Sequence, residues 1–429
     1  MLVILLCLTG AAAIGADEPE MDPLLELLVE QGVITEEQAR AVQIEYDRRE
    51  AAKATPPEMV IAETPQTEVA EIAPVPEPGR MKQEKWYDRI DFRGDLRLRY
   101  EGFWIDGISD NNHRGRERLR VRPGIYAPVT DWMKVGLQLR SGDPLDPVSD
   151  NQTVDGGFTM KPIAISEAFA TFTPLDWFGL HAGKFDAKKL WKVSDMQWDD
   201  DVTVEGLLQN LSFGAFEASL YQYSLEERKQ GDDSYLLGGQ VRGNFKLGSK
   251  NKITVGAGYD DWVNAQYVAD LTLDGKIRGN RVTNILDGDD MLVSDFNVGN
   301  LFAEWSHNAG SRWPIKLTAF GYHNFGARDL GKDYDNGYFI RFQIGDYKKK
   351  GQIAFRASRY FSQPDSIFYV FAQSDTTMVS DVDGYRFDLR LGWVMRSYFN
   401  FTWYHTQPSS DLEDVEVMDR LQVDYIIRF

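Results

Sequence analysis

The sequence predicts an all-β transmembrane barrel of about 16 antiparallel up-and-down strands, preceded by a short α-helical segment. Three observations predict this fold. After residue 16 the 429-residue chain has no apolar run long enough for a membrane helix. Its aromatic content is nevertheless 13%. Apolar and polar residues also alternate along many short segments, so a chain that is polar on average can still present an apolar face to lipid.

The charge balance excludes two classes of protein. The chain has 66 Asp and Glu residues against 47 Lys and Arg residues, which gives a net charge of −19. Nucleic-acid binders need a basic surface that displaces counterions from phosphates, so no nucleic-acid partner is expected. The lack of long apolar segments after residue 16 excludes a helical membrane protein.

Residues 1–16 are predicted to be a signal peptide. The apolar run Leu2–Ile14 is followed by Gly15 and Ala16, and small residues in this position are typical of a cleavage site. The single cysteine, Cys7, lies inside this segment. The exported chain would therefore contain no disulfide and no cysteine-based metal or redox site.

Residues 17–54 are predicted to form a helical periplasmic segment. Pro23 suits the first turn of one helix, and the capping box that begins at Thr35 starts a second one. Two helices of this size need a partner for packing. Residues 55–85 contain six prolines and almost no aromatic residue, which indicates an extended linker. The barrel is predicted over residues 86–429.

Strict alternation with a period of two indicates strands whose two faces differ in polarity. In Asp91–Glu101, for example, one phase is apolar and the other is charged. The strands predicted in this way span residues 89–104, 115–128, 131–142, 160–173, 177–185, 200–210, 213–225, 234–248, 251–262, 294–308, 313–326, 335–346, 351–363, 382–397, 398–407 and 416–429.

The connections between these strands alternate between short and long, which predicts a meander with one short-turn rim and one long-loop rim. Aromatic residues gather at both rims, as expected of interfacial girdles. A soluble β-sandwich, the alternative, does not need aromatics at its strand ends. The predicted girdle residues are Trp132, Trp177, Phe178, Trp313, Tyr347, Tyr398 and Phe399 at the short turns, and Trp104, Tyr259, Trp262, Tyr322 and Trp403 at the opposite rim.

The last strand resembles the C-terminal assembly signal of Gram-negative outer-membrane proteins, in which alternating apolar residues end in a terminal aromatic. The residues that carry this resemblance are Leu421, Val423, Tyr425, Ile427 and Phe429. The chain as a whole also resembles the putative porin family. The matching features are the signal peptide, the helical stretch from Leu24 to Ala39, the linker and the large barrel.

The resemblance implies an outer-membrane location in a Gram-negative bacterium, a homotrimer and a channel that passes small hydrophilic solutes. It also implies contact with outer-membrane lipid and lipopolysaccharide, and insertion by the barrel-assembly machinery. It supplies no catalytic residues. The five histidines lie in separate predicted elements, and none has a nearby nucleophile motif, so we expect no enzyme activity.

If the apolar phases face lipid, the charged phases face the lumen, where cations outnumber acids. The first two strands concentrate a pore-lining basic patch, which predicts a preference for anions. Arginine and acid pairs on neighbouring strands are the alternative explanation, as structural ladders. The patch consists of Arg93, Arg97, Arg99, Arg118, Arg120, Arg122 and Arg140.

The long loops are rich in acidic residues and are expected to form a solvated outer rim. Clustered carboxylates can bind Ca²⁺ or Mg²⁺, but no stretch matches a twelve-residue calcium loop, so no cofactor is expected beyond such loop-bound ions. By the same resemblance, the third long loop is a candidate constriction that folds into the pore. Its charged residues are Lys188, Lys189, Lys192, Asp195 and Asp199.

A structural role is the main alternative to a channel. The helical segment and linker could trimerise or grip the cell wall, and the barrel would then act as an outer-membrane anchor or adhesin.

Overall fold

The computed structural model describes residues 35, 40, 89–106, 113–229, 231–265, 279–284, 290–328, 334–376, 379–412 and 417–429. The chain divides into two compact units, residues 1–81 and 82–429. The predicted signal peptide, helical segment and linker lie outside the described residues, apart from Thr35 and Arg40. In the described part of the chain, no helix is long and apolar enough to cross a membrane.

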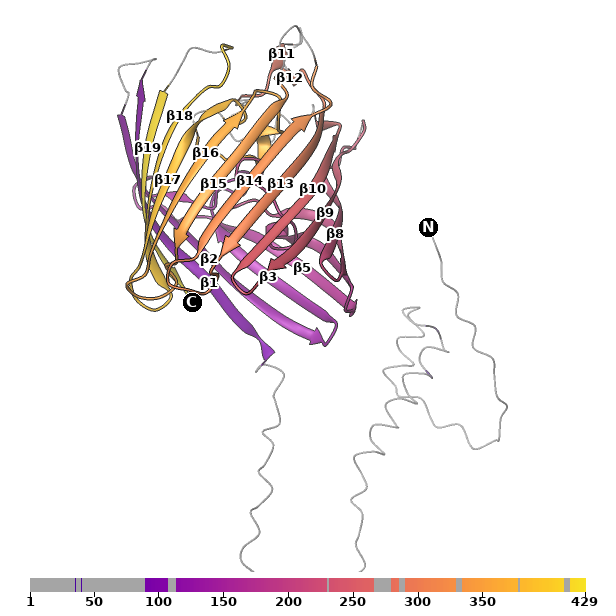
Figure 1. The fold of residues 1–429 in the computed structure, drawn as a ribbon. Coiled ribbons are helices and arrows are strands. Elements are labelled where there is room, and N and C mark those ends of the chain that lie inside the picture. Colours follow the sequence, from indigo (N-terminus) through magenta and orange to yellow (C-terminus); the bar gives the residue numbers. More distant parts are fainter. Residues whose placement is uncertain are drawn as a thin grey trace, which may run out of the picture. The chain divides into compact units, whose positions relative to one another are not determined.

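Sixteen antiparallel strands close into a barrel (Figure 1). Each strand pairs with its neighbours in chain order, and β1 pairs with both β2 and β19, which closes the sheet. The strands are β1 (Asp91–Asp106), β2 (His113–Thr130), β3 (Met133–Ser141), β5 (Ile163–Leu175), β6 (Phe178–Phe185), β7 (Val204–Phe213), β8 (Phe216–Glu226), β9 (Ser234–Leu247), β10 (Asn251–Val263), β13 (Phe296–His307), β14 (Ile315–Asn324), β15 (Asn336–Gly345), β16 (Ile353–Ser362), β17 (Val382–Gly392), β18 (Ser397–Gln407) and β19 (Val417–Arg428).

Three shorter strands lie within the long connections. The two-residue strand β4 (Gln152–Thr153) pairs with β2 after β3 has ended. Strands β11 (Val282–Asn284) and β12 (Asp290–Leu292) form a separate hairpin at the long-loop rim (Figure 1). These additions leave the predicted sixteen-stranded meander confirmed.

Five predicted strand boundaries are wrong by more than two residues. The strands expected to begin at 160 and 213 begin at Ile163 and Phe216. The strand expected over 200–210 is β7 (Val204–Phe213), which begins later because Arg120 holds Asp201 inside the barrel. The strand expected over 382–397 ends at Gly392, and residues 393–396 form the turn to β18. Arg396 has a φ of 63° in that turn, a conformation that interrupts a strand.

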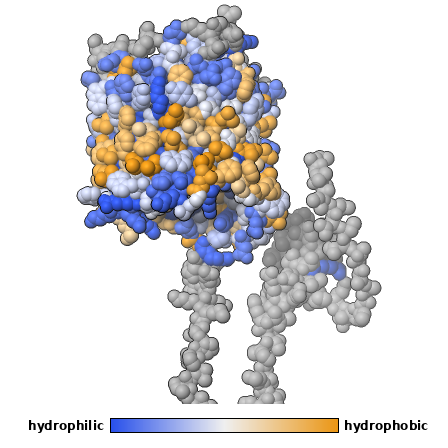
Figure 2. Space-filling model, in the orientation of Figure 1, coloured by the Kyte–Doolittle hydropathy of each residue, from blue (hydrophilic) through white to orange (hydrophobic). Residues whose placement is uncertain are grey.

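The two faces of each strand have the predicted polarity. On β1, the side chains of Arg97 and Arg99 point inward and the residues are 8% exposed, whereas Leu98 and Tyr100 point outward and are 50% and 48% exposed. Figure 2 shows the resulting apolar band around the middle of the barrel, with hydrophilic residues above and below it. An apolar band of this kind is what a lipid-facing barrel surface requires.

The aromatic girdles are confirmed only in part. Exposed tryptophans lie at both rims, including Trp132, Trp177 and Trp313 at the short turns and Trp104 and Trp403 at the long-loop rim. A second group of predicted girdle residues faces the interior instead, because each occupies the inward phase of its strand or turn. That group consists of Tyr347, Tyr398, Trp262 and Tyr322.

The seam that closes the barrel depends on a close approach between Gly94 and the C-terminus. The backbone N–H of Gly94 donates to the carbonyl of Phe429 at 3.0 Å, and the reverse bond is 3.1 Å long. The Phe429 ring also stacks on Phe92, with ring centroids 5.7 Å apart. A Cβ atom on Gly94 would lie 2.3 Å from the backbone carbonyl oxygen of Arg122 and 2.8 Å from the Phe429 ring.

Replacing Gly94 with valine is therefore expected to destabilise the folded barrel by about 1–3 kcal/mol, since the new side chain overpacks the seam. Urea unfolding in lipid vesicles, followed by the mobility difference between folded and unfolded forms, measures the effect. The matched control is Gly321→Val, because a Cβ atom at Gly321 meets nothing within 4 Å. Equal unfolding midpoints for the two variants would contradict the role of the seam.

Candidate functional site in the barrel lumen

The lumen contains a cavity of about 1350 Å³. Its wall is formed mainly by β1, β2 and β16–β19, together with the connections 142–162, 186–203 and 363–381. The lining residues include 15 Lys or Arg side chains and 11 Asp or Glu side chains. The described part of the cavity wall is therefore densely charged, with cations in excess.

Arginines face one another across the seam between β1 and β2. In the strand register Arg97 lies opposite Arg120, and Arg99 lies opposite Arg118. Since alternate residues of a strand share a face, these four side chains all point into the lumen. Like charges directly opposite each other destabilise a sheet, so this wall requires counter-charges.

Part of the counter-charge comes from the strands themselves. Glu101 is completely buried, and its carboxylate accepts hydrogen bonds from Arg116 and, at 2.7 Å, from Arg420. Asp95 binds Arg120 at 2.8 Å and Arg122 at 2.7 Å. Asp424, on the adjacent strand β19, pairs with Arg99 at 2.6 Å. The wall is thus partly the arginine–acid ladder that the sequence allowed as an alternative.

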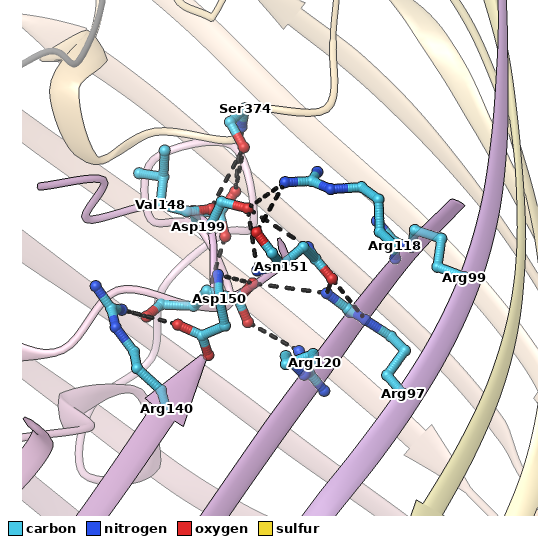
Figure 3. Close-up of polar contacts among 12 residues, drawn as sticks. Arg97, Arg99, Arg118, Arg120, Arg140, Val148, Asp150, Asn151, Asp199 and Ser374 are labelled. Atoms are coloured by element: carbon cyan, nitrogen blue, oxygen red, sulfur yellow. Dashed lines mark hydrogen bonds and ion pairs between the residues drawn. The ribbon is translucent and has the colours of Figure 1, made fainter. Parts of the chain in front are cut away.

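The remaining counter-charge comes from loops that fold into the barrel (Figure 3). Asp201 lies 2.9 Å from Arg120 and 3.3 Å from Arg122. Asp150 pairs with Arg122 at 3.1 Å and with Arg140 at 2.8 Å. Arg97 donates to the side-chain oxygen of Asn151 at 2.5 Å. Connection 142–162, which was expected at the rim, and connection 186–203, which contains the candidate constriction loop, therefore both contact the arginine wall.

The loop carboxylates differ in their affinity for protons. Burial alone would raise the pKa of Asp201, but nearby arginines, with Arg120 foremost, outweigh it and hold the pKa well below its usual range. Burial and the Asp201 carboxylate raise the pKa of Asp150 to about 6. Burial and the same neighbour also raise the pKa of Asp199 well above its ordinary value.

The other side of the lumen is filled by aromatic side chains. Trp191 and Trp198 of connection 186–203 are 2% and 3% exposed. The Trp191 ring lies 4.2 Å from that of Tyr221 on β8, and the Trp198 ring lies 5.5 Å from that of Trp262 on β10. The Gln197 amide donates to Asp260 at 2.7 Å. The loop is thus anchored on this apolar wall and presents Asp201 to the arginines on the opposite wall.

Connection 363–381 packs against connection 186–203. The sequence did not predict this role. The backbone N–H of Asp199 donates to the carbonyl of Phe371 at 2.8 Å, and that of Gln373 donates to Met196 at 3.1 Å. Phe368 lies between Trp262 and Phe296, with ring centroids 4.8 Å and 5.4 Å away. The apolar run 367–372 in the sequence indicates that this connection is buried, because loops exposed to solvent are usually polar.

Six of the seven basic-patch residues line the cavity, and Arg93 is the most exposed of them. Its side chain is 57% exposed, and its guanidinium lies 3.9 Å from the centre of the Tyr126 ring. It lies four residues before Arg97, near the start of β1 at the short-turn rim. The structure therefore brings together Arg97, Arg99, Arg118, Arg120 and Arg122 around the cavity, and Arg140 is buried beside them, paired with Asp150.

The candidate constriction loop lies inside the barrel, but most of its charges are engaged. Lys188 donates to the carbonyls of Asp199 and Val202, and Lys192 pairs with Glu304 at 2.7 Å. Asp195 binds Arg341 on β15, and the Asp199 carboxylate accepts from Ser374. Only Lys189 is largely exposed, with 71% of its side chain accessible to solvent.

The expectation of a wholly solvated acidic rim is wrong. Asp150, Asp195, Asp199 and Asp201 lie within the lumen, because the arginines on the strands attract them inward. The divalent-cation sites considered for these loops stay a prediction. Among the described residues, no group of three or more His, Cys, Asp or Glu side chains is placed to hold a metal ion.

The residues of the predicted assembly signal alternate with lumen-facing neighbours on β19. Leu421, Val423, Tyr425 and Ile427 are the outward phase, and Gln422 and Asp424 between them are 1% exposed. Their role in assembly stays a prediction.

Asp201→Asn is expected to lower the free energy of unfolding by about 3 kcal/mol, because it leaves buried guanidiniums without their shared counter-charge. Thermal unfolding followed by circular dichroism tests this expectation. The neighbouring exposed residue provides the control, since Asp200→Asn removes the same charge from a solvated position. A loss of equal size in both variants would show that Asp201 does not hold the loop to the wall.

Comparisons with known proteins agree with this geometry. A family described as "Putative porin" matches residues 108–273, which include β2 to β10. A high-pH structure of Pseudomonas putida OprB shares the fold with a TM-score of 0.51 and 12% identity, over 79% of this chain and 95% of that one. A triple mutant of Rhodopseudomonas blastica porin has a TM-score of 0.44 and 10% identity, over 79% and 100% of the two chains.

No curated protein matches the chain. At 12% identity the OprB structure indicates a shared fold and nothing finer. The family match over residues 108–273 and the closed sixteen-stranded barrel around a charged cavity lead to one conclusion: the chain has a porin-like β-barrel fold and resembles the putative porins over this part of its length.

Proposed function

We propose that this barrel forms a water-filled channel for the passive diffusion of small hydrophilic solutes and that it prefers anions. The observation that carries the proposal is the charge of the cavity wall, where 15 basic side chains outnumber 11 acidic ones. Cationic side chains at close quarters in a pore favour anions. Low-dielectric walls focus this field along the passage.

The connections that fold into the lumen are also consistent with a preference for anions. The carboxylates that reach the arginine wall are shared among several guanidiniums, as Asp201 is between Arg120 and Arg122. The passage along β1 and β2 thus keeps a net positive wall.

The partners follow from the proposed location. We assign residues 17–54 to the periplasm, and the exposed apolar band to contact with outer-membrane lipid and lipopolysaccharide. The barrel-assembly machinery would recognise the terminal strand. A homotrimer is the assembly we expect, and chemical cross-linking of the native membrane tests it.

Reversal potentials in a salt gradient across planar bilayers test the selectivity. Wild-type channels are expected to favour chloride over potassium, because the wall attracts anions. Clear cation selectivity would refute the preference. Liposome swelling tests the channel itself: a porin admits small sugars, whereas a plugged structural anchor does not.

Lowering the pH from 7.5 to 5 is expected to increase the anion preference. The pKa of Asp150 is about 6, so this carboxyl is ionised at pH 7.5 and protonated at pH 5. Its protonation removes a negative charge next to Arg122 and Arg140. Reversal potentials at the two pH values measure the change. Asp150→Asn should already show the stronger preference at pH 7.5 and should lose much of the pH dependence; a pH response identical to that of the wild type would exclude Asp150 as its source.

A further inference from the structure

We propose that the lumen holds a binding site for a small oxyanion, a carboxylate or a phosphate, between Arg390 and Arg428 beside the tyrosine pair Tyr347 and Tyr398. The site lies toward the short-turn rim, on β16 to β19 and the turn that precedes β16. These strands are neighbours in the barrel (Figure 1). The inference rests on the proposed function, because the ligand must enter through the channel.

The arginines of this site differ from those of the β1–β2 wall. Arg356, Arg390 and Arg428 line the cavity, and none of them forms an ion pair with a carboxylate in the described part of the chain. Their side-chain partners are neutral: Gln343 for Arg356, Asn400 and Tyr347 for Arg390, and Tyr398 for Arg428. Among the described residues, these three cations in one region of the lumen therefore have no carboxylate within ion-pair distance.

The nearest acids are already engaged elsewhere. Asp388 lies directly opposite Arg356 in the strand register, yet it accepts from Arg386 at 2.8 Å and from Thr402 at 3.0 Å. Asp424 lies opposite Asn400 and pairs with Arg99. Both carboxylates pair with other arginines, and Asp388 attracts Arg356 and Arg390 only from beyond ion-pair distance, so a diffusible anion can complete their neutralisation.

The tyrosines give the site its shape. The ring centres of Tyr347 and Tyr398 are 4.6 Å apart. The guanidinium of Arg390 lies 5.0 Å from the Tyr347 ring centre, and that of Arg428 lies 5.3 Å from the Tyr398 ring centre. Two charged groups thus flank one pair of phenols, held by cation–π contacts rather than by acids.

Hydrogen-bond donors are abundant at this position. Each phenol oxygen accepts from its arginine, at 3.1 Å from Arg390 and 3.4 Å from Arg428, so each hydroxyl hydrogen can donate elsewhere. Each guanidinium also has more N–H groups than these bonds use. Planar N–H forks recognise carboxylate and phosphate oxygens in a bidentate manner, which chloride cannot reproduce.

The site predicts a saturable interaction with oxyanions. Benzoate and inorganic phosphate, each added alone, should reduce the chloride current through wild-type channels with a half-saturating concentration. Arg428→Gln is expected to raise that concentration about tenfold for at least one of the two probes, and Arg390→Gln/Arg428→Gln should raise it further. The single variant is the safer one for folding, because Arg428 lies at the end of β19 and its side-chain partners are the two neutral tyrosines Tyr398 and Tyr347.

The matched control is Arg242→Gln, which removes an arginine that pairs with Glu217 on the opposite wall, outside the cavity lining. It should change the half-saturating concentration by less than about twofold. Two results would overturn the site. One is a half-saturating concentration that the Arg390 and Arg428 variants leave unchanged. The other is a conducting wild-type channel in which neither probe gives a saturable block.

Calorimetric titration of the folded barrel in detergent with the same probes separates the two proposals. The barrel could bind a probe but fail to conduct, with Arg428→Gln weakening the binding. That result would support the site and refute the proposed channel. An anion-selective channel that binds neither probe would refute the site and leave the channel function standing.

Discussion

The structure depends on how this barrel neutralises the arginines of its first two strands. Arg97 faces Arg120 and Arg99 faces Arg118 across one strand pair, and all four point away from lipid. Acids on the strands compensate only part of this charge. The rest is supplied by Asp150 and Asp201, which are carried into the lumen by long connections. The inward path of these loops, and so the width of the channel, follows from that electrostatic requirement.

The same loops divide the lumen into two unlike halves. Where β8, β10 and β13–β15 form the wall, Trp191, Trp198 and Phe368 pack into an aromatic core that resembles the interior of a soluble protein. Where β1, β2 and β16–β19 form the wall, charged side chains surround an open cavity. Loop 186–203 belongs to both halves, because it is anchored by apolar burial on one side and by ion pairs on the other. The open cavity of the described lumen therefore lies on the basic side of the barrel.

Within the basic side, charge compensation is uneven, and this matters for function. The guanidiniums near Asp95, Glu101 and Asp201 are largely neutralised by their neighbours. Among the described residues, the hydrogen-bond partners of Arg390 and Arg428 are neutral. This difference between the two levels of the wall is the basis of the proposed anion preference and of the proposed oxyanion site.

The sequence by itself determined the sixteen strands, their order and their polar and apolar faces. Each of these properties depends on alternation with a period of two and on the length of the adjacent connection, both of which are local. It did not reveal that Tyr347, Tyr398, Trp262 and Tyr322 face inward, since a residue at a strand end has too few neighbours to define its phase. The inward fold of the third long loop was expected only from the resemblance, and its partners were not revealed: an aspartate such as Asp201 looks like a solvated residue until Arg120, 81 positions away in the chain, is brought within 2.9 Å. Only the closed barrel decides such pairings, because it places distant charges around one enclosed space where each must find a partner or remain available to a solute.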